Sequence, residues 1–118
     1  MGKKILIADD DKGFVKLLGV FLQKQGYDIV TAYDGAEALV KMQKTFPDLV
    51  ILDIVMPHVN GYAFVLELKK LKREPEIPII VLTCKEQFQD IFKVEGVKEY
   101  IVKPFEHADL LEKIKKYI

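Results

Sequence analysis

The chain has 118 residues, of which 18 are basic and 18 acidic, so its formal net charge is zero. This length suits one domain, and an apolar content of 50% is enough for one core and too high for a disordered segment. A neutral chain lacks the broad positive field that nucleic acids and anionic membranes attract, and Arg73 is the only arginine available to read base edges. We therefore expect no direct binding to nucleic acid or to a membrane.

The sequence also bears on the compartment. A single cysteine, Cys84, cannot form an internal disulfide, which is typical of a reducing environment. The first residues lead into a short apolar run without a signal-peptide pattern, and nowhere do 18 apolar residues follow one another. We expect a cytoplasmic protein with no transmembrane helix.

Five short runs rich in Ile and Val have the length of β-strands: 5–8, 29–32, 49–52, 79–82 and 100–102. Stretches with helical apolar spacing follow them, for example Phe14, Leu18 and Phe21 after the first run. Continuous apolar strands that alternate with helices indicate a parallel sheet covered on both faces. The predicted fold class is therefore a single doubly wound (βα)5 domain of the α/β class.

Several residues mark the expected ends of the helices. Gly26 is predicted to end the first helix, while Asp34 with Glu37 forms a start similar to a capping box for the second, which closes at Pro47. Gly61 is expected to open the third helix. Pro75 and Pro78 are expected to bracket the turn into the fourth strand.

Acidic side chains follow two of the predicted strands. Asp9, Asp10 and Asp11 come directly after the first strand, and Asp53 ends the third. Parallel strands end at one edge of the sheet, and ligands of doubly wound folds bind there, where the strand order reverses. Such a cluster suits a hard cation with oxygen ligands, above all Mg²⁺. The alternative for residues 9–11 is that one caps the helix and the others are solvated.

The fourth and fifth strands end in a hydroxyl and an ammonium group. Thr83 follows Val81 and Leu82, and Lys103 follows Val102. Each residue alone is commonplace at a strand end. Together with the acids they form a site able to hold a metal, an aspartyl phosphate and its counter-charge.

The ordered set of motifs resembles the receiver domains of response regulators, the CheY-like domains of two-component phosphorelay signalling. The resemblance spans the whole chain and rests on ILIADDD at 5–11, LDIVMP at 52–57 with Gly61, and KPF at 103–105. It implies a flavodoxin-like fold with strand order 2-1-3-4-5. It also implies one receiver domain over 1–118 with no effector domain in this chain.

The resemblance further implies roles for individual residues. Asp53 would be the phosphoacceptor, and Asp9, Asp10, Asp53 and the backbone carbonyl of Val55 would hold Mg²⁺, with Asp9 acting through water. Thr83 and Lys103 would bind phosphoryl oxygens. Thr83 and Tyr100 would form the switch. The Lys103–Pro104 bond resembles one that is cis in the family.

The implied partners are a sensor histidine kinase or phosphotransfer protein as donor, and a downstream protein that binds the face of the fourth helix, fifth strand and fifth helix. The domain would be a monomer or a phosphorylation-dependent dimer, and a phosphoacceptor rather than an enzyme.

The sequence also departs from the family pattern. Thr83 and Lys103 lie 20 positions apart, about two fewer than the pattern leads us to expect, so the fourth helix should be short or irregular. This puts the usual partner geometry in doubt. Cys84 stands where the family favours a small residue, and we expect it to pack as a small hydrophobe. The alternative is that its thiol narrows the access of phosphate to the site.

Three other functions are compatible with parts of this pattern. A degenerate receiver would act only as a protein-binding module, although all five expected active-site positions are filled. A phosphatase of the haloacid-dehalogenase type needs a second Asp two positions after the nucleophile, where this chain has Val55. A flavodoxin-like redox module needs a phosphate-binding loop after the first strand, where acids would repel the flavin phosphate.

The two histidines, and two phenylalanines near the fourth helix, have no expected catalytic role. His58 and His107 lack metal-ligand spacing and are expected in surface loops or at helix starts. Phe88 and Phe92 are four positions apart, so they should share a helix face that packs in the core. If exposed, they would mark a partner surface.

Overall fold

The computed structural model describes residues 2–56, 60–71 and 76–118. Its sheet consists of five parallel strands: β1 (Lys4–Ala8), β2 (Asp28–Ala32), β3 (Leu49–Leu52), β4 (Ile79–Thr83) and β5 (Glu99–Val102). The strand order is β2-β1-β3-β4-β5, as the resemblance implied. Every predicted strand is present within one residue of its expected bounds.

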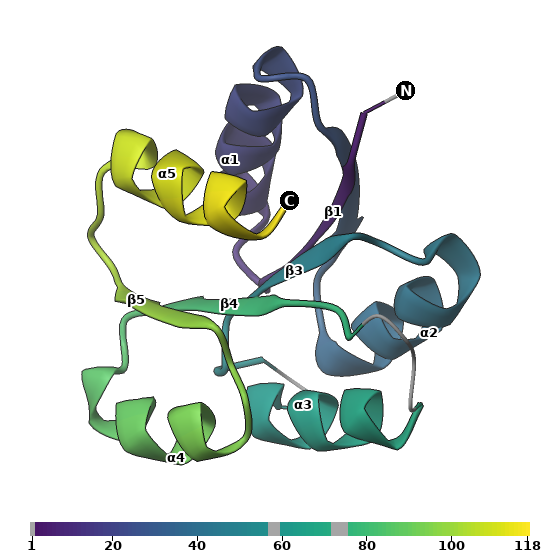
Figure 1. The fold of residues 1–118 in the computed structure, drawn as a ribbon, viewed down its shortest axis with the longest axis vertical. Helices are drawn as coiled ribbons and strands as arrows, with labels where there is room; N and C mark the ends of the chain where they lie inside the picture. The colour runs from purple at the N-terminus through teal and green to yellow at the C-terminus, as the bar shows by residue number, and fades with distance from the viewer. Residues whose placement is uncertain (1, 57–59, 72–75) are drawn as a thin grey trace.

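The helices are α1 (Lys12–Lys24), α2 (Gly35–Thr45), α3 (Gly61–Lys70), α4 (Gln89–Val94) and α5 (His107–Tyr117), with the 3₁₀ turn η1 (Glu86–Phe88) before α4. In Figure 1, α1 and α5 lie on one face of the sheet and α2, α3 and α4 on the other. The six residues of α4 confirm that the fourth helix is short.

The two faces of the sheet build two separate cores, because successive side chains of a strand point to opposite sides. In β3, Leu49 and Ile51 face the helices α1 and α5, whereas Val50 and Leu52 face α2 and α3. All four side chains are buried, since β3 is a central strand and helices cover both faces of the sheet there (Figure 1). The edge strands β2 and β5 are only partly buried, so the expectation of burial on both faces holds for the central strands alone.

Local signals account for the helix ends. Asp34 accepts from the backbone N–H of Glu37 at 2.7 Å, and the Glu37 carboxylate accepts from the N–H of Tyr33, so the predicted cap is present in a slightly shifted form. Gly26 follows the end of α1 with φ of 99°, as a C-terminal glycine does. Phe46 ends α2 in the left-handed region, one residue before Pro47.

The start of α3 requires a glycine. A Cβ atom at Gly61 would lie 2.4 Å from the Cα of Ile54, and the N–H of Gly61 donates to the carbonyl of Ile54 at 3.0 Å. The chain after β3 therefore contacts the first turn of α3 directly. Pro57, His58 and Pro75, which the sequence predictions involve, lie outside the described residues.

Candidate phosphoacceptor site

The predicted site residues meet at the carboxyl edge of the sheet because the sheet register continues past the strands. The N–H of Asp9 donates to Ala32 at 3.0 Å, that of Asp53 to Ala8 at 2.9 Å, and that of Lys103 to Thr83 at 2.8 Å. The side chains that follow β1, β3 and β5 therefore start from fixed backbone positions. The sheet, rather than a loop, sets their spacing.

Three carboxylates converge at this edge. One oxygen from each of Asp9, Asp10 and Asp53 lies within 4.8 Å of the others. Asp9 and Asp53 are buried, while Asp10 is exposed. Carboxylates so close together repel one another unless a cation lies among them, and oxygen donors of this kind suit a hard divalent ion.

Asp11 caps the helix that follows the acidic run, which is the alternative role expected for one of residues 9–11. Its carboxylate accepts from the N–H of Phe14 at 3.1 Å and caps α1. The N–H of Asp11 in turn donates to Asp9 at 2.9 Å, which fixes the orientation of that carboxylate. The run of three acids thus divides into a helix cap and two members of the acidic cluster.

Lys103 supplies the positive charge of the site. Its Nζ donates to Asp9 Oδ2 at 2.8 Å and lies 3.5 Å from Asp53 Oδ2. Burial lowers the pKa of Lys103, but the hydrogen bond and charge of Asp9 and the charge of Asp53 outweigh it and leave that pKa raised. Burial raises the pKa of Asp9, and the contacts with Lys103 offset this only in part.

Thr83 and Tyr100 share a neighbour in the loop after β4. Thr83 is fully buried, and its hydroxyl oxygen accepts from the N–H of Lys85 at 3.3 Å. The hydroxyl of Tyr100 donates to the carbonyl of the same Lys85. The Tyr100 ring packs near Phe92 of α4, with ring centroids 6.1 Å apart, so the partly buried tyrosine contacts both the loop and α4. Burial, with a smaller contribution from the charge of Asp53, raises the pKa of Tyr100.

Val55 and Asn60 shape the loop between β3 and α3. The N–H of Val55 donates to Asp53 Oδ1 at 3.1 Å, and the Val55 side chain is 48% exposed. Asn60 caps α3 by accepting from the N–H of Ala63 at 2.9 Å. The loop thus presents the backbone of Val55 beside the carboxylate of Asp53.

Two expectations near the site need correction. Cys84 does not pack as a small hydrophobe, since it is exposed in the bend where the chain leaves β4. Phe88 and Phe92 do not both pack in the core: Phe92 is buried, whereas Phe88 is 39% exposed, and both line a groove of about 570 Å³. Phe88 ends η1 and Phe92 lies in α4, so the spacing of four positions does not run along one α-helix.

The Lys103–Pro104 peptide bond is cis, as the resemblance implied. His107 is exposed and is the first residue of α5, which confirms its expected place at a helix start.

Comparisons with known proteins identify this arrangement. The family model of the response regulator receiver domain matches residues 5–115, and the chain belongs to that family. It is 38% identical to the alkaline phosphatase synthesis transcriptional regulatory protein PhoP of Bacillus subtilis and 42% identical to the probable transcriptional regulator ycf27 of Cyanophora paradoxa. Each alignment covers 98% of this chain and 48% of the relative, so the chain spans about half the length of these curated relatives.

Solved structures agree with this assignment. The chemotaxis protein CheY4 of Vibrio cholerae has a TM-score of 0.91 and 32% identity, with all of both chains covered. The response regulator TrrA of Thermotoga maritima, solved in complex with Mg²⁺ and BeF, has a TM-score of 0.89 and 39% identity, with 98% of this chain and 99% of TrrA covered.

Membership of the family makes this chain a phosphoacceptor module of two-component signalling rather than a classical enzyme. It also implies a sensor histidine kinase as the class of partner. Among the described residues, no helix is long and apolar enough to cross a membrane.

Proposed function

We propose that Asp53 accepts a phosphoryl group from the phosphohistidine of a sensor kinase or phosphotransfer protein. The observation that carries this proposal is the position of the Asp53 carboxylate, which lies 3.5 Å from Lys103 Nζ and within 4.8 Å of the oxygens of Asp9 and Asp10. In the transfer, a carboxylate oxygen of Asp53 forms a bond to phosphorus as the phosphorus–nitrogen bond of the donor breaks. The imidazole of the donor leaves with the electron pair of that bond.

The acidic cluster fits Mg²⁺, the ion named with TrrA. Asp9, Asp10, Asp53 and the backbone carbonyl of Val55 would hold it, Asp9 through water. When bound, Mg²⁺ supplies positive charge to the oxygens of the phosphoryl group. The buried Asp9 and Asp53 favour such an ion because Lys103 alone offsets only one of the three negative charges.

Lys103 and Thr83 would hold the transferred group. The ammonium pairs with one phosphoryl oxygen as a point charge, and the hydroxyl of Thr83 donates to another. Lys103 is already in contact with Asp53, and Thr83 ends the next strand along the same edge. Lys103 therefore needs no large movement to reach a group carried by Asp53.

Thr83 and Tyr100 would transmit the change. In the structure, the N–H of Lys85 donates to the Thr83 hydroxyl. A Thr83 hydroxyl that turns toward a phosphoryl oxygen would break this hydrogen bond. The loop would then shift, and with it the carbonyl of Lys85 that holds Tyr100. The downstream partner would bind the face formed by α4, β5 and α5, to which this tyrosine belongs.

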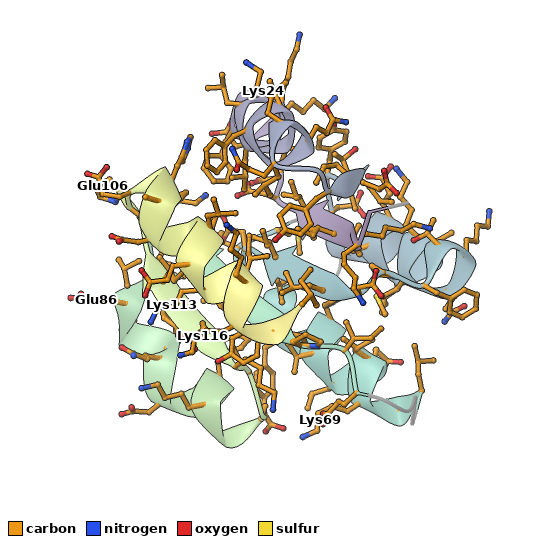
Figure 2. The ribbon with its side chains drawn as sticks, turned by 45° about the horizontal axis from the view of Figure 1, so that its top comes forward. Lys24, Lys69, Glu86, Glu106, Lys113 and Lys116 are labelled. Carbon is orange, nitrogen blue, oxygen red and sulfur yellow. The ribbon has the colours of Figure 1, made fainter. Side chains whose placement is uncertain are left out.

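The same proposal covers the setting of the domain. The receiver unit takes up residues 1–118, works in the cytoplasm, and is a monomer or a dimer that forms on phosphorylation. Glu99 of β5 lies 3.5 Å from Lys113 and 3.6 Å from Lys116, both on α5 (Figure 2), so charged side chains are part of the face available to a partner.

The test is phosphorylation with acetyl phosphate and Mg²⁺, followed by intact-mass spectrometry. Wild-type protein should gain one phosphoryl group, and EDTA or Asp53→Asn should abolish the gain. Asp11→Asn is the matched control, because asparagine caps a helix as well as aspartate does and Asp11 belongs to the cap of α1. A wild-type chain that gains no phosphoryl group would favour the degenerate receiver that only binds a partner protein.

A further inference from the structure

Lys103 has a third contact besides the two carboxylates. Its Nζ lies 4.1 Å from the centroid of the Phe14 ring, well within the distance at which a cation is attracted to an aromatic face. Asp9 and Asp53 also contact this ammonium. The lysine side chain is only 22% exposed, so Phe14 replaces part of the water that would otherwise surround it.

The Phe14 ring also contacts a second aromatic ring. Phe105 meets it edge to face, with centroids 6.1 Å apart and planes at 79°. Both rings pack against the core on the α1 and α5 side of the sheet. The backbone N–H of Phe14 donates to the helix cap Asp11, which fixes the first turn of α1. The ring position is therefore supported by contacts other than that with the lysine, namely the first turn of α1 and Phe105.

We propose that Phe14 is a positioning residue for Lys103, which keeps its ammonium directed at Asp53. This inference rests on the proposed role of Lys103 in binding the phosphoryl group. A free lysine side chain has many rotamers, and each must be given up when the ammonium pairs with an oxygen. A lysine that is already ordered does not incur that cost again during the transfer.

An aromatic ring suits this role because it carries no charge. The hold of Asp9 on Lys103 would weaken when a divalent cation is bound, because the Asp9 carboxylate would then also accept from a water of that cation. The attraction of the Phe14 ring does not depend on that carboxylate. Phe14 thus keeps the ammonium near Asp53 under the conditions in which phosphoryl transfer takes place.

The experiment compares initial rates of phosphorylation by acetyl phosphate with Mg²⁺ in four proteins: the wild type, Phe14→Leu, Phe14 replaced by trifluorophenylalanine, and the control Phe21→Leu. Fluorination keeps the shape of the ring and removes its attraction for cations. Phe21 is on the same helix and packs against the same core, but its ring lies against that of His107, with ring centroids 4.7 Å apart, rather than against Lys103. We expect both changes at Phe14 to slow the reaction roughly two- to fivefold and Phe21→Leu to leave the rate unchanged.

A second readout observes the lysine itself. In the unphosphorylated protein, NMR of ¹³Cε-labelled lysine should show the ε protons of Lys103 shifted upfield by the Phe14 ring, and Phe14→Leu should abolish the shift. The signal of Lys103 is assigned as the one that is missing from the spectrum of the Lys103→Arg protein. An unshifted Lys103 signal in the wild type, or equal rates for the wild type and both Phe14 variants, would overturn the inference. A wild type that accepts no phosphoryl group would instead refute the proposed function, so the two failures are distinguishable.

Discussion

Substitution of Lys103 by methionine tests the electrostatic account of the site. The change keeps most of the apolar stem and removes the ammonium that contacts Asp9 at 2.8 Å and Asp53 at 3.5 Å. Both carboxylates stay buried, with Asp9 only 2% exposed, and Asp10 remains beside them. Removing one partner of a buried ion pair costs about 3–5 kcal/mol. Because water still reaches the lysine, we expect the lower end, about 3 kcal/mol.

Urea unfolding at pH 7 in EDTA measures this loss. The matched control is Lys113→Met, which removes an ammonium 3.5 Å from Glu99 on a side chain that is 38% exposed. Exposed pairs contribute about 0–1 kcal/mol, so the control should change the free energy of unfolding far less. Equal small losses for the two variants would refute the idea that Lys103 offsets buried negative charge.

Mg²⁺ should reverse much of the loss in the Lys103→Met protein. A divalent cation held by the acidic cluster would compete with Lys103 for two of the three carboxylates, Asp9 and Asp53, so the variant should bind Mg²⁺ more tightly than the wild type does. A ligand at about 100 times its dissociation constant stabilises a protein by about 2.7 kcal/mol. Unfolding curves at increasing Mg²⁺ should therefore converge for the two proteins, and parallel curves would contradict a shared site.

Two further predictions concern the fold. Gly61→Ala should lower the free energy of unfolding by about 1–3 kcal/mol, since its Cβ would lie 2.4 Å from the Cα of Ile54. The control Gly13→Ala, in the first turn of α1, should be neutral or stabilising, and equal urea midpoints for the two variants would contradict the close contact at Gly61. Burial raises the pKa of Glu99, but the hydrogen bond from Tyr117 and the neighbouring lysines outweigh it and hold that pKa below the ordinary 4.5. The ionised Glu99 therefore stabilises the fold above pH 4.5, and this contribution is lost as the pH falls through the lowered pKa. Glu99→Gln should flatten that part of the stability profile in acid unfolding, and an unchanged slope would refute the assignment.

Much of the fold could be predicted from the sequence because its signals are local. The apolar runs of β1, β3 and β4 mark strands buried on both faces, and Asp34 with Glu37 marks the start of α2. Asp9 and Asp53 could be brought together from topology alone, since parallel strands end at one edge. These predictions need only the spacing of apolar residues along the chain and the parallel direction of the strands.

The remaining features depend on the path of loops and on side-chain rotamers. Nothing in the sequence places the ring of Phe14 beside Lys103, which lies 89 positions away, because the contact requires α1 to pack beside the end of β5. The exposure of Cys84 depends on the bend after β4. The shared contact of Thr83 and Tyr100 with Lys85 likewise arises from the turn that leads into η1.

The most direct test of the account is to locate the phosphoryl group. Wild-type protein treated with acetyl phosphate and Mg²⁺ is digested, and tandem mass spectrometry identifies the modified residue. The account predicts a single phosphoryl group on Asp53, and no modified peptide when Asp53→Asn protein is treated in the same way. A phosphoryl group on another residue of the wild type, or equal modification of both proteins, would contradict it.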